Sequence, residues 1–145
     1  MQLQTSRGAA QRQAYQGFAV LVVDDDPLIR ELLATILPSR GFTVAAAVDG
    51  NEGLAMFQRH AFSVVLTDRE MPGMDGVTMA RAIKGLAPRT PVIMMTGSGA
   101  TSTEVRSCVD YLLAKPIHME VLVAILKVAA TSRPSAIRNK TAAWL

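Results

Sequence analysis

The sequence lacks the features of a secreted or membrane-embedded protein. Cys108 is the only cysteine among 145 residues, so no disulfide can form within the chain, and a lone thiol fits a reducing compartment. The longest early apolar run, Phe18–Val23, stops at three aspartates. It is too short for a signal-peptide core or a bilayer-spanning helix. Internal repeats and low-complexity tracts are also lacking. We therefore expect one cytoplasmic domain of ordinary size.

Acidic residues are missing from both ends of the chain. All twelve lie between Asp24 and Glu120, whereas six of the fifteen basic residues lie outside that span. The net charge of +3 therefore belongs to the ends, which are too sparsely basic to resemble a DNA-binding arm. We expect a flexible leader at residues 1–17, a folded domain at 18–131 and a tail at 132–145. The tail holds mostly small and polar residues, and its Trp144 could dock on a surface.

Short apolar runs alternate with helical patterns between these ends. The runs consist mostly of Val, Ile, Leu and Ala without strict polar alternation, which is typical of strands buried on both faces of a parallel sheet. We expect strands at Ala19–Val23, Thr43–Ala47, Ser63–Thr67, Pro91–Met95 and Tyr111–Ala114.

Helical patterns fill the intervals between the strands. Pro27 suits a first helical turn, Pro38 and Gly41 should end that helix, and Asn51 can cap the next one. Three more helices are expected at Gly76–Ile83, at Ser102–Cys108 and from His118 or Met119 to Ala130. Five such strand–helix units with right-handed crossovers give a doubly wound α/β sheet. Functional groups in these sheets gather beyond the carboxyl ends of the strands.

Polar residues follow four of the five predicted strands. The first strand runs into Asp24-Asp25-Asp26, the third into Asp68, the fourth into Thr96-Gly97-Ser98 and the fifth into Lys115. Clustered carboxylates repel one another unless a cation lies among them, and a hard divalent ion such as Mg²⁺ or Mn²⁺ suits oxygen ligands. With a hydroxyl and a lysine added, this edge of the sheet has the parts of a phosphoryl-transfer site.

The same segments resemble the receiver domain of bacterial response regulators over Phe18 to Ala130. The matching stretches are VLVVDDDPLIRELL, VVLTDREMPGMDG, PVIMMTG and LLAKPI. The resemblance implies a flavodoxin-like fold with strand order 2-1-3-4-5 and helices on both faces of the sheet. It also implies that Asp68 is the phosphoacceptor. Asp24, Asp25, Asp68 and the backbone carbonyl of Glu70 would hold Mg²⁺, with Asp25 a direct ligand.

Further roles follow from the resemblance. Thr96 would hydrogen-bond the bound phosphoryl group, and Lys115 would pair with one of its oxygens. The bond before Pro116 would be cis, and Gly97 would keep the phosphoryl pocket open. Glu70 and Ser98 would tune the rate of dephosphorylation.

The sequence departs from the family pattern in two places. The family usually carries an aromatic gate three residues before the lysine, but that position is Leu112, and Tyr111 is displaced by one. Because one position along a strand reverses the side chain, we expect Tyr111 not to gate in the usual way. The stretch from Thr96 to Lys115 is also about three residues shorter than usual in the family, so the fourth helix should be short or distorted.

The expected function is that of a stand-alone phosphoacceptor in a two-component or phosphorelay system. A sensor histidine kinase or a histidine phosphotransfer protein would phosphorylate it, and a downstream protein would bind the switched surface. It would catalyse only its own phosphorylation and dephosphorylation, without a membrane or nucleic-acid partner. Two alternatives stay open: a phosphorylation-independent interaction module, and a haloacid-dehalogenase-type phosphatase with Asp24 as nucleophile. The second needs an acidic pair after Lys115, where only Glu120 follows.

Overall fold

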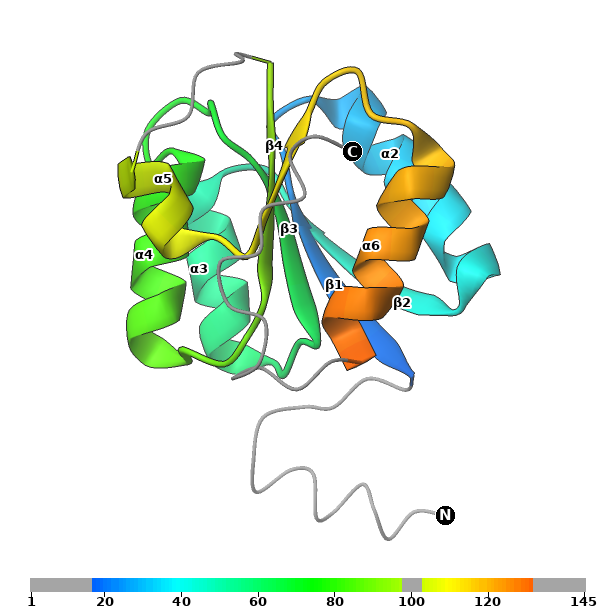
Figure 1. Ribbon diagram of the computed structural model, residues 1–145, viewed down its shortest axis with the longest axis horizontal. Helices are drawn as coiled ribbons and strands as arrows, with labels where there is room; N and C mark the ends of the chain where they lie inside the picture. Colours follow the sequence, from blue (N-terminus) through cyan, green and yellow to red (C-terminus); the bar gives the residue numbers. More distant parts are fainter. Residues whose placement is uncertain (1–16, 98–102, 132–145) are drawn as a thin grey trace, which may run out of the picture.

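Five short strands form one parallel sheet at the centre of the molecule (Figure 1). The computed structural model describes residues 17–97 and 103–131. The sheet order is β2-β1-β3-β4-β5, which confirms the predicted topology. The strands are β1 (Phe18–Val23), β2 (Phe42–Ala47), β3 (Val64–Asp68), β4 (Val92–Thr96) and β5 (Tyr111–Ala114).

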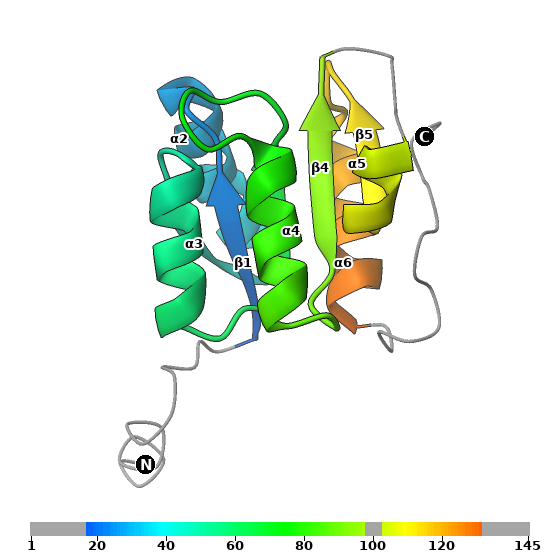
Figure 2. The same cartoon turned by 90° about the vertical axis from the view of Figure 1, so that its left-hand side faces the viewer.

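Helices cover both faces of the sheet, as Figures 1 and 2 show from two directions. One face carries α2 (Pro27–Ile36), the 3₁₀ turn η1 (Leu37–Arg40) and α6 (Met119–Thr131). The other face carries α3 (Gly50–Arg59), α4 (Gly76–Leu86) and α5 (Thr103–Cys108). All residues of β3 and β4 are buried, because helices lie above and below these central strands. This arrangement explains why both strands begin with a continuous apolar run, Val64–Leu66 and Val92–Met95, rather than alternating.

Two helix boundaries show what local sequence could and could not specify. The first helix ends at Ile36, and the 3₁₀ turn η1 that contains Pro38 is capped by Gly41, which takes the left-handed conformation with φ of 97°. Pro38 and Gly41 thus mark the end of this helical segment, as predicted. The predicted cap of α3 at Asn51 is wrong. Asp49 is the cap, because its side chain accepts a hydrogen bond from the Glu52 N–H at 2.8 Å.

A partly buried ion pair joins α4 to the sheet at the amino ends of β4 and β5. Lys84 Nζ lies 2.6 Å from Asp110 Oδ2 and donates to the carbonyl oxygen of Thr90 at 2.8 Å. The same Asp110 oxygen accepts a hydrogen bond from the Val92 N–H at 2.8 Å. The two side chains are only 19% and 12% exposed. This Lys84–Asp110 clamp therefore fixes the edge of the sheet opposite to the one where the polar residues gather.

Candidate functional site

The sheet brings the predicted site residues to one edge. Asp24 directly follows β1, Asp68 is the last residue of β3, Thr96 is the last residue of β4, and Lys115 directly follows β5. These four strands are neighbours in the order β1-β3-β4-β5 and run parallel. Their carboxyl ends therefore meet at one rim, as the sequence predicted.

Three carboxylates converge at this rim. Asp24, Asp25 and Asp68 each offer an oxygen, and these oxygens all lie within 4.8 Å of one another. Asp24 is fully buried and Asp68 is 6% exposed, whereas Asp25 is open to solvent. Like charges this close in a buried setting repel strongly unless a cation compensates them.

Asp24 is the carboxylate with the clearest need for a partner. Its Oδ1 accepts a hydrogen bond from the Asp26 N–H at 2.9 Å. Its Oδ2 is buried and has no hydrogen-bond partner among the residues that the structure describes. Burial, with the nearby Asp68 charge, raises the pKa of Asp24 above its usual value, although the Asp26 N–H and Lys115 oppose the shift. An orphaned oxygen beside two further carboxylates fits a hard divalent ion such as Mg²⁺ or Mn²⁺.

Lys115 reaches into the same group of charges. Its Nζ lies 2.9 Å from Asp68 Oδ1, and the Lys115–Pro116 bond is cis, as the resemblance implied. The Lys115 N–H also donates to the Thr96 carbonyl at 2.8 Å, which ties the ends of β4 and β5 together. Burial is the largest influence on the Lys115 pKa and lowers it. The hydrogen bond to Asp68 and the three carboxylate charges outweigh burial, so the pKa is raised.

Arg30 is a supporting residue that the sequence reasoning missed. Its Nη1 donates to the backbone carbonyl of Asp24 at 2.7 Å, while the Arg30 N–H bonds the Asp26 carbonyl at 3.1 Å. Arg30 thus holds the turn that carries the acidic pair. No local spacing rule pointed to this contact, because Arg30 and Asp24 are six positions apart and Asp24 precedes the helix.

Glycines shape the backbone on either side of the rim. A Cβ on Gly76 would lie 2.2 Å from the carbonyl oxygen of Asp68, so only glycine lets α4 begin this close to the site. Gly97 is exposed, and a Cβ there would meet no described atom within 4 Å. That Gly97 keeps the phosphoryl pocket open stays a prediction. Glu70 is exposed between β3 and α4, and Ser98 lies outside the described residues.

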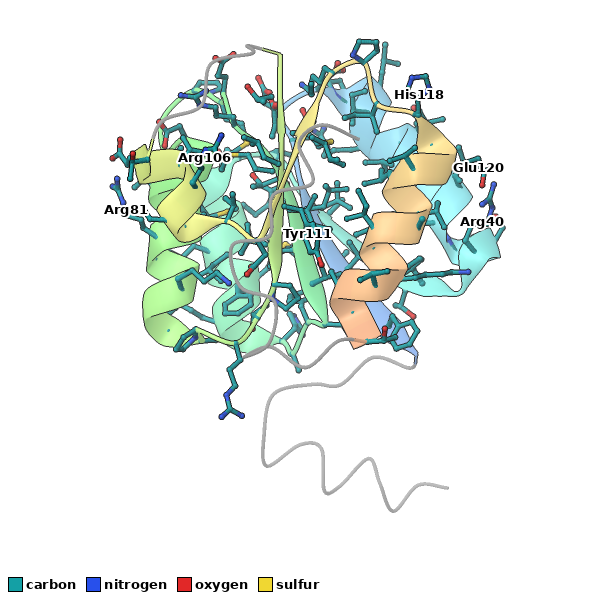
Figure 3. The ribbon with its side chains drawn as sticks, in the orientation of Figure 1. Arg40, Arg81, Arg106, Tyr111, His118 and Glu120 are labelled. Carbon is teal, nitrogen blue, oxygen red and sulfur yellow. The ribbon has the colours of Figure 1, made fainter. Side chains whose placement is uncertain are left out.

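Tyr111 and Leu112 point to opposite faces of the sheet. Tyr111 packs in the half of the core beneath α2 and α6 (Figure 3). Leu112 packs in the half beneath α3, α4 and α5. The one-residue displacement seen in the sequence therefore puts the aromatic ring on the far side of the sheet from the predicted gate position.

A family model, the response regulator receiver domain, matches residues 20–127. The chain belongs to this family. The receiver domain is 37% identical over 114 residues to the sensor histidine kinase RcsC of Salmonella typhimurium. That match covers 77% of this chain but only 12% of RcsC, so the chain spans a small part of this relative. Receiver domains are the phosphoacceptor domains of response regulators and sensor kinases.

Solved structures agree with the receiver fold. The chemotaxis protein CheY4 of Vibrio cholerae is 32% identical with a TM-score of 0.72, covering 78% of this chain and 98% of CheY4. The response regulator TrrA of Thermotoga maritima, solved in complex with Mg(2+)-BeF, is 30% identical with a TM-score of 0.73. That match covers 77% of this chain and 98% of TrrA. Receiver domains bind Mg²⁺ at an acidic pocket, and the grouped aspartates provide one here.

Among the described residues, no helix combines the length and the apolar character needed to cross a bilayer.

Proposed function

We propose that Asp68 accepts a phosphoryl group and that this modification switches a protein-binding surface. The supporting observation is the contact of Asp68 Oδ1 with Lys115 Nζ at 2.9 Å, within a rim that also groups Asp24 and Asp25. A nucleophile, a cation and metal-ligand carboxylates at one sheet edge are the parts that phosphoryl transfer requires.

The reaction is a transfer between two nucleophiles. An oxygen of the Asp68 carboxylate attacks phosphorus, the bond from phosphorus to the imidazole nitrogen of a phosphohistidine breaks, and the imidazole leaves with that electron pair. The product is an acyl phosphate on Asp68. Little covalent chemistry is left to the protein, so its task is in-line positioning and compensation of charge.

A divalent ion would supply charge neutralisation at this rim. Asp24, Asp25 and Asp68, together with the backbone carbonyl of Glu70, would hold Mg²⁺ or Mn²⁺. The unpartnered Oδ2 of Asp24 supports this assignment, because a buried carboxylate oxygen without a donor among the described residues is otherwise costly.

Thr96 and Lys115 would bind the phosphoryl group on Asp68 and respond to its charge. Lys115 already touches Asp68, and its backbone is bonded to Thr96, so a phosphoryl group on Asp68 gives both residues a common new partner. Movement of either one carries the loops after β4 and β5 with it. A shift between two arrangements of these loops is the proposed output.

The donor would be a sensor histidine kinase or a histidine phosphotransfer protein, and a downstream protein would bind the switched surface. We place this exchange in the cytoplasm, where the lone thiol of Cys108 stays reduced. Residues 18–131 would form the receiver domain, flanked by a leader and a tail. The domain would catalyse only its own phosphorylation and dephosphorylation.

Labelling with a small phosphodonor tests the proposal. Wild-type protein incubated with acetyl phosphate and Mg²⁺ should gain one phosphoryl group, located on Asp68 by mass spectrometry, and chelation of the metal should prevent this. Asp68→Asn should not be labelled. Asp49→Asn is the matched control, because Asp49 only caps α3 and asparagine caps equally well.

The location of the label separates the alternatives. Label on Asp24 would contradict the proposal and favour a dehalogenase-type phosphatase. That interpretation has little support, since Glu120 pairs with Arg40 at 2.7 Å on the surface. A complete lack of label, with partner binding retained in Asp68→Asn, would indicate a phosphorylation-independent module. The short stretch of sequence between Thr96 and Lys115 favours that second candidate over the phosphatase.

A further inference from the structure

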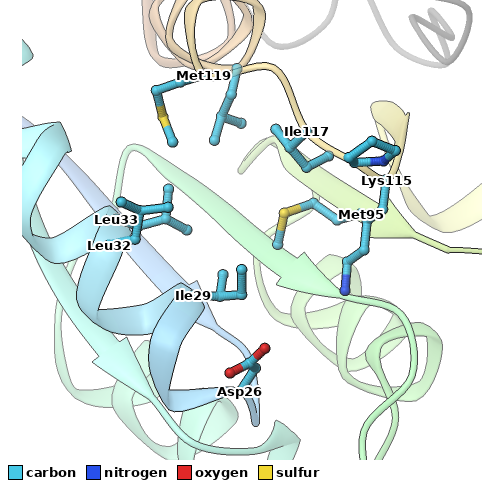
Figure 4. Close-up of a pocket in the computed structure, with 10 residues that line it drawn as sticks. Asp26, Ile29, Leu32, Leu33, Met95, Lys115, Ile117 and Met119 are labelled. Atoms are coloured by element: carbon cyan, nitrogen blue, oxygen red, sulfur yellow. The ribbon is translucent and has the colours of Figure 1, made fainter.

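An apolar pocket opens beside the acidic rim, between α2 and the segment that leads from β5 into α6 (Figure 4). Its volume is about 370 Å³, within the range of pockets that bind small molecules. Apolar side chains from α2, β4, the β5–α6 segment and α6 form most of its wall: Ile29, Leu32, Leu33, Met95, Ile117, Met119 and Leu122. Asp26 and Lys115 lie at its edge next to the rim.

The mouth of this pocket is unusually apolar for a surface. Leu32 lines the pocket and is 46% exposed, and Leu28, one turn earlier on α2, is 72% exposed. Two large exposed aliphatic side chains beside an apolar hollow mark a place where another apolar group binds. The occupant must therefore carry at least one large apolar side chain.

The chain itself supplies such a group. Trp144 is the only tryptophan in the sequence, and Leu145 follows it in a tail that otherwise holds mostly small and polar residues. Both lie outside the described residues. We propose that Trp144, with Leu145 beside it, binds the apolar pocket of its own chain.

The tail is long enough to reach the pocket. From Thr131, the end of α6, back to Met119 at its start is about 18 Å along the helix axis. The thirteen residues from Thr131 to Trp144 span up to about 43 Å when extended. The tail has ample length to run back alongside α6 and place Trp144 over the pocket.

Charge and connectivity favour the tail over a separate molecule. Residues 132–145 carry three basic and no acidic residues, whereas residues 18–131 carry ten basic and twelve acidic ones. The pocket edge carries one charge of each sign, Asp26 and Lys115, so the attraction of the basic tail comes from the excess of acidic residues in the folded domain. A tethered occupant also acts at an effective concentration in the millimolar range, so even weak binding fills the pocket.

An occupied pocket would lie against the phosphoacceptor site. Lys115 belongs to both, and Met95 of the pocket wall precedes Thr96. Trp144 would therefore contact the loops after β4 and β5 that are proposed to move. This regulatory consequence rests on the proposed function, whereas the binding of Trp144 to the pocket is independent of it.

Fluorescence of Trp144 tests the binding directly, without metal or phosphodonor. In the 145-residue chain, its emission should be blue-shifted relative to N-acetyltryptophanamide and protected from acrylamide quenching. Leu32→Lys should shift the emission to the wavelength of that reference and remove the protection. Leu86→Lys is the matched control, because Leu86 is 55% exposed on α4, across the sheet, and should leave the spectrum unchanged.

Three results would overturn the proposal. One is wild-type emission equal to the reference; another is an unchanged spectrum in Leu32→Lys that remains folded by circular dichroism. The third is a blue shift that disappears on dilution, since this would place the tail of a second copy, or a dimer contact, in the pocket. Failure of acetyl phosphate labelling would count against the proposed function alone, because the fluorescence measurement does not depend on it.

Discussion

Replacing Asp24 by asparagine should stabilise the metal-free protein, although it removes a residue of the proposed site. The asparagine amide keeps a side-chain oxygen that can accept the Asp26 N–H. The substitution also removes a buried negative charge whose Oδ2 has no partner in the part of the chain that the structure describes. Burial and the Asp68 charge raise the pKa of Asp24, so its ionised form is disfavoured in the folded state.

The size of the effect follows from the charges around Asp24. The Asp24 carboxylate lies near two like charges, Asp25 and Asp68, whose oxygens are within 4.8 Å, and one opposite charge, Lys115. Removing its charge therefore relieves two repulsions and loses one attraction, a net gain equal to one repulsive pair. One such pair is worth about 1 kcal/mol in water and about 3 kcal/mol at the effective dielectric near a protein surface. For a domain of this size, the melting temperature should rise by about 5–15 °C.

The assay is thermal unfolding with and without a divalent ion. In chelator, Asp24→Asn should melt above wild type. With Mg²⁺ in large excess over its dissociation constant, wild type should gain about 2–4 kcal/mol, whereas Asp24→Asn should gain much less. The difference in melting temperature between Asp24→Asn and wild type should therefore become smaller, or change sign, when metal is added.

The pH dependence supplies an independent check. Because the folded pKa of Asp24 is raised from 3.8, the metal-free folded state binds this proton more tightly than the unfolded state does. Proton binding by Asp24 therefore stabilises the wild-type fold fully below the pKa of the unfolded state, and this stabilisation is lost as the pH rises through the pKa of the folded state. The gain in stability of Asp24→Asn over wild type should thus be largest at neutral pH and become smaller in acid. A lower melting point for Asp24→Asn in chelator at neutral pH would refute the reasoning.

Three further predictions concern the switch and the scaffold. Tyr111→Phe should leave phosphorylation-dependent partner binding intact, since this ring lies on the α2 and α6 face; loss of binding with normal labelling would contradict this. Glu70→Asn should change the lifetime of the phosphorylated form, measured by decay of the label. Unaltered decay would exclude a role of Glu70 in tuning the dephosphorylation rate. Lys84→Met should lower the free energy of unfolding by about 3 kcal/mol in denaturant titrations, because it leaves Asp110 buried without its counter-charge. Arg40→Gln, whose partner carboxylate is 78% exposed, should have a much smaller effect, and equal losses would refute the distinction.

The sheet and its rim could be predicted because the relevant signals are local. Each buried strand is a short apolar run, and each chemical group stands at the end of such a run, as with Asp68 after Val64–Thr67. Parallel strands then bring those ends together without any further information. The opposite orientations of Tyr111 and Leu112 followed equally directly from the two-residue period of a strand.

Features that depend on three-dimensional context could not be predicted. Asp49 and Asn51 are both good helix caps, and only the path of the chain after β2 decides between them. The Lys84–Asp110 pair joins residues 26 positions apart, which no local pattern connects. The apolar pocket is likewise assembled from three separate stretches of the chain, so its volume has no signature in any one of them.

The Lys84–Asp110 clamp has a consequence for how displacement is transmitted through the sheet. It anchors the entry to β5, while Lys115 stands at the exit of that four-residue strand. An element pinned at one end moves as a lever, so small rotations at the base are magnified at the tip. Over a strand of about 13 Å, a tilt of about 5° displaces the tip by about 1 Å, comparable to the difference between a formed and a broken hydrogen bond.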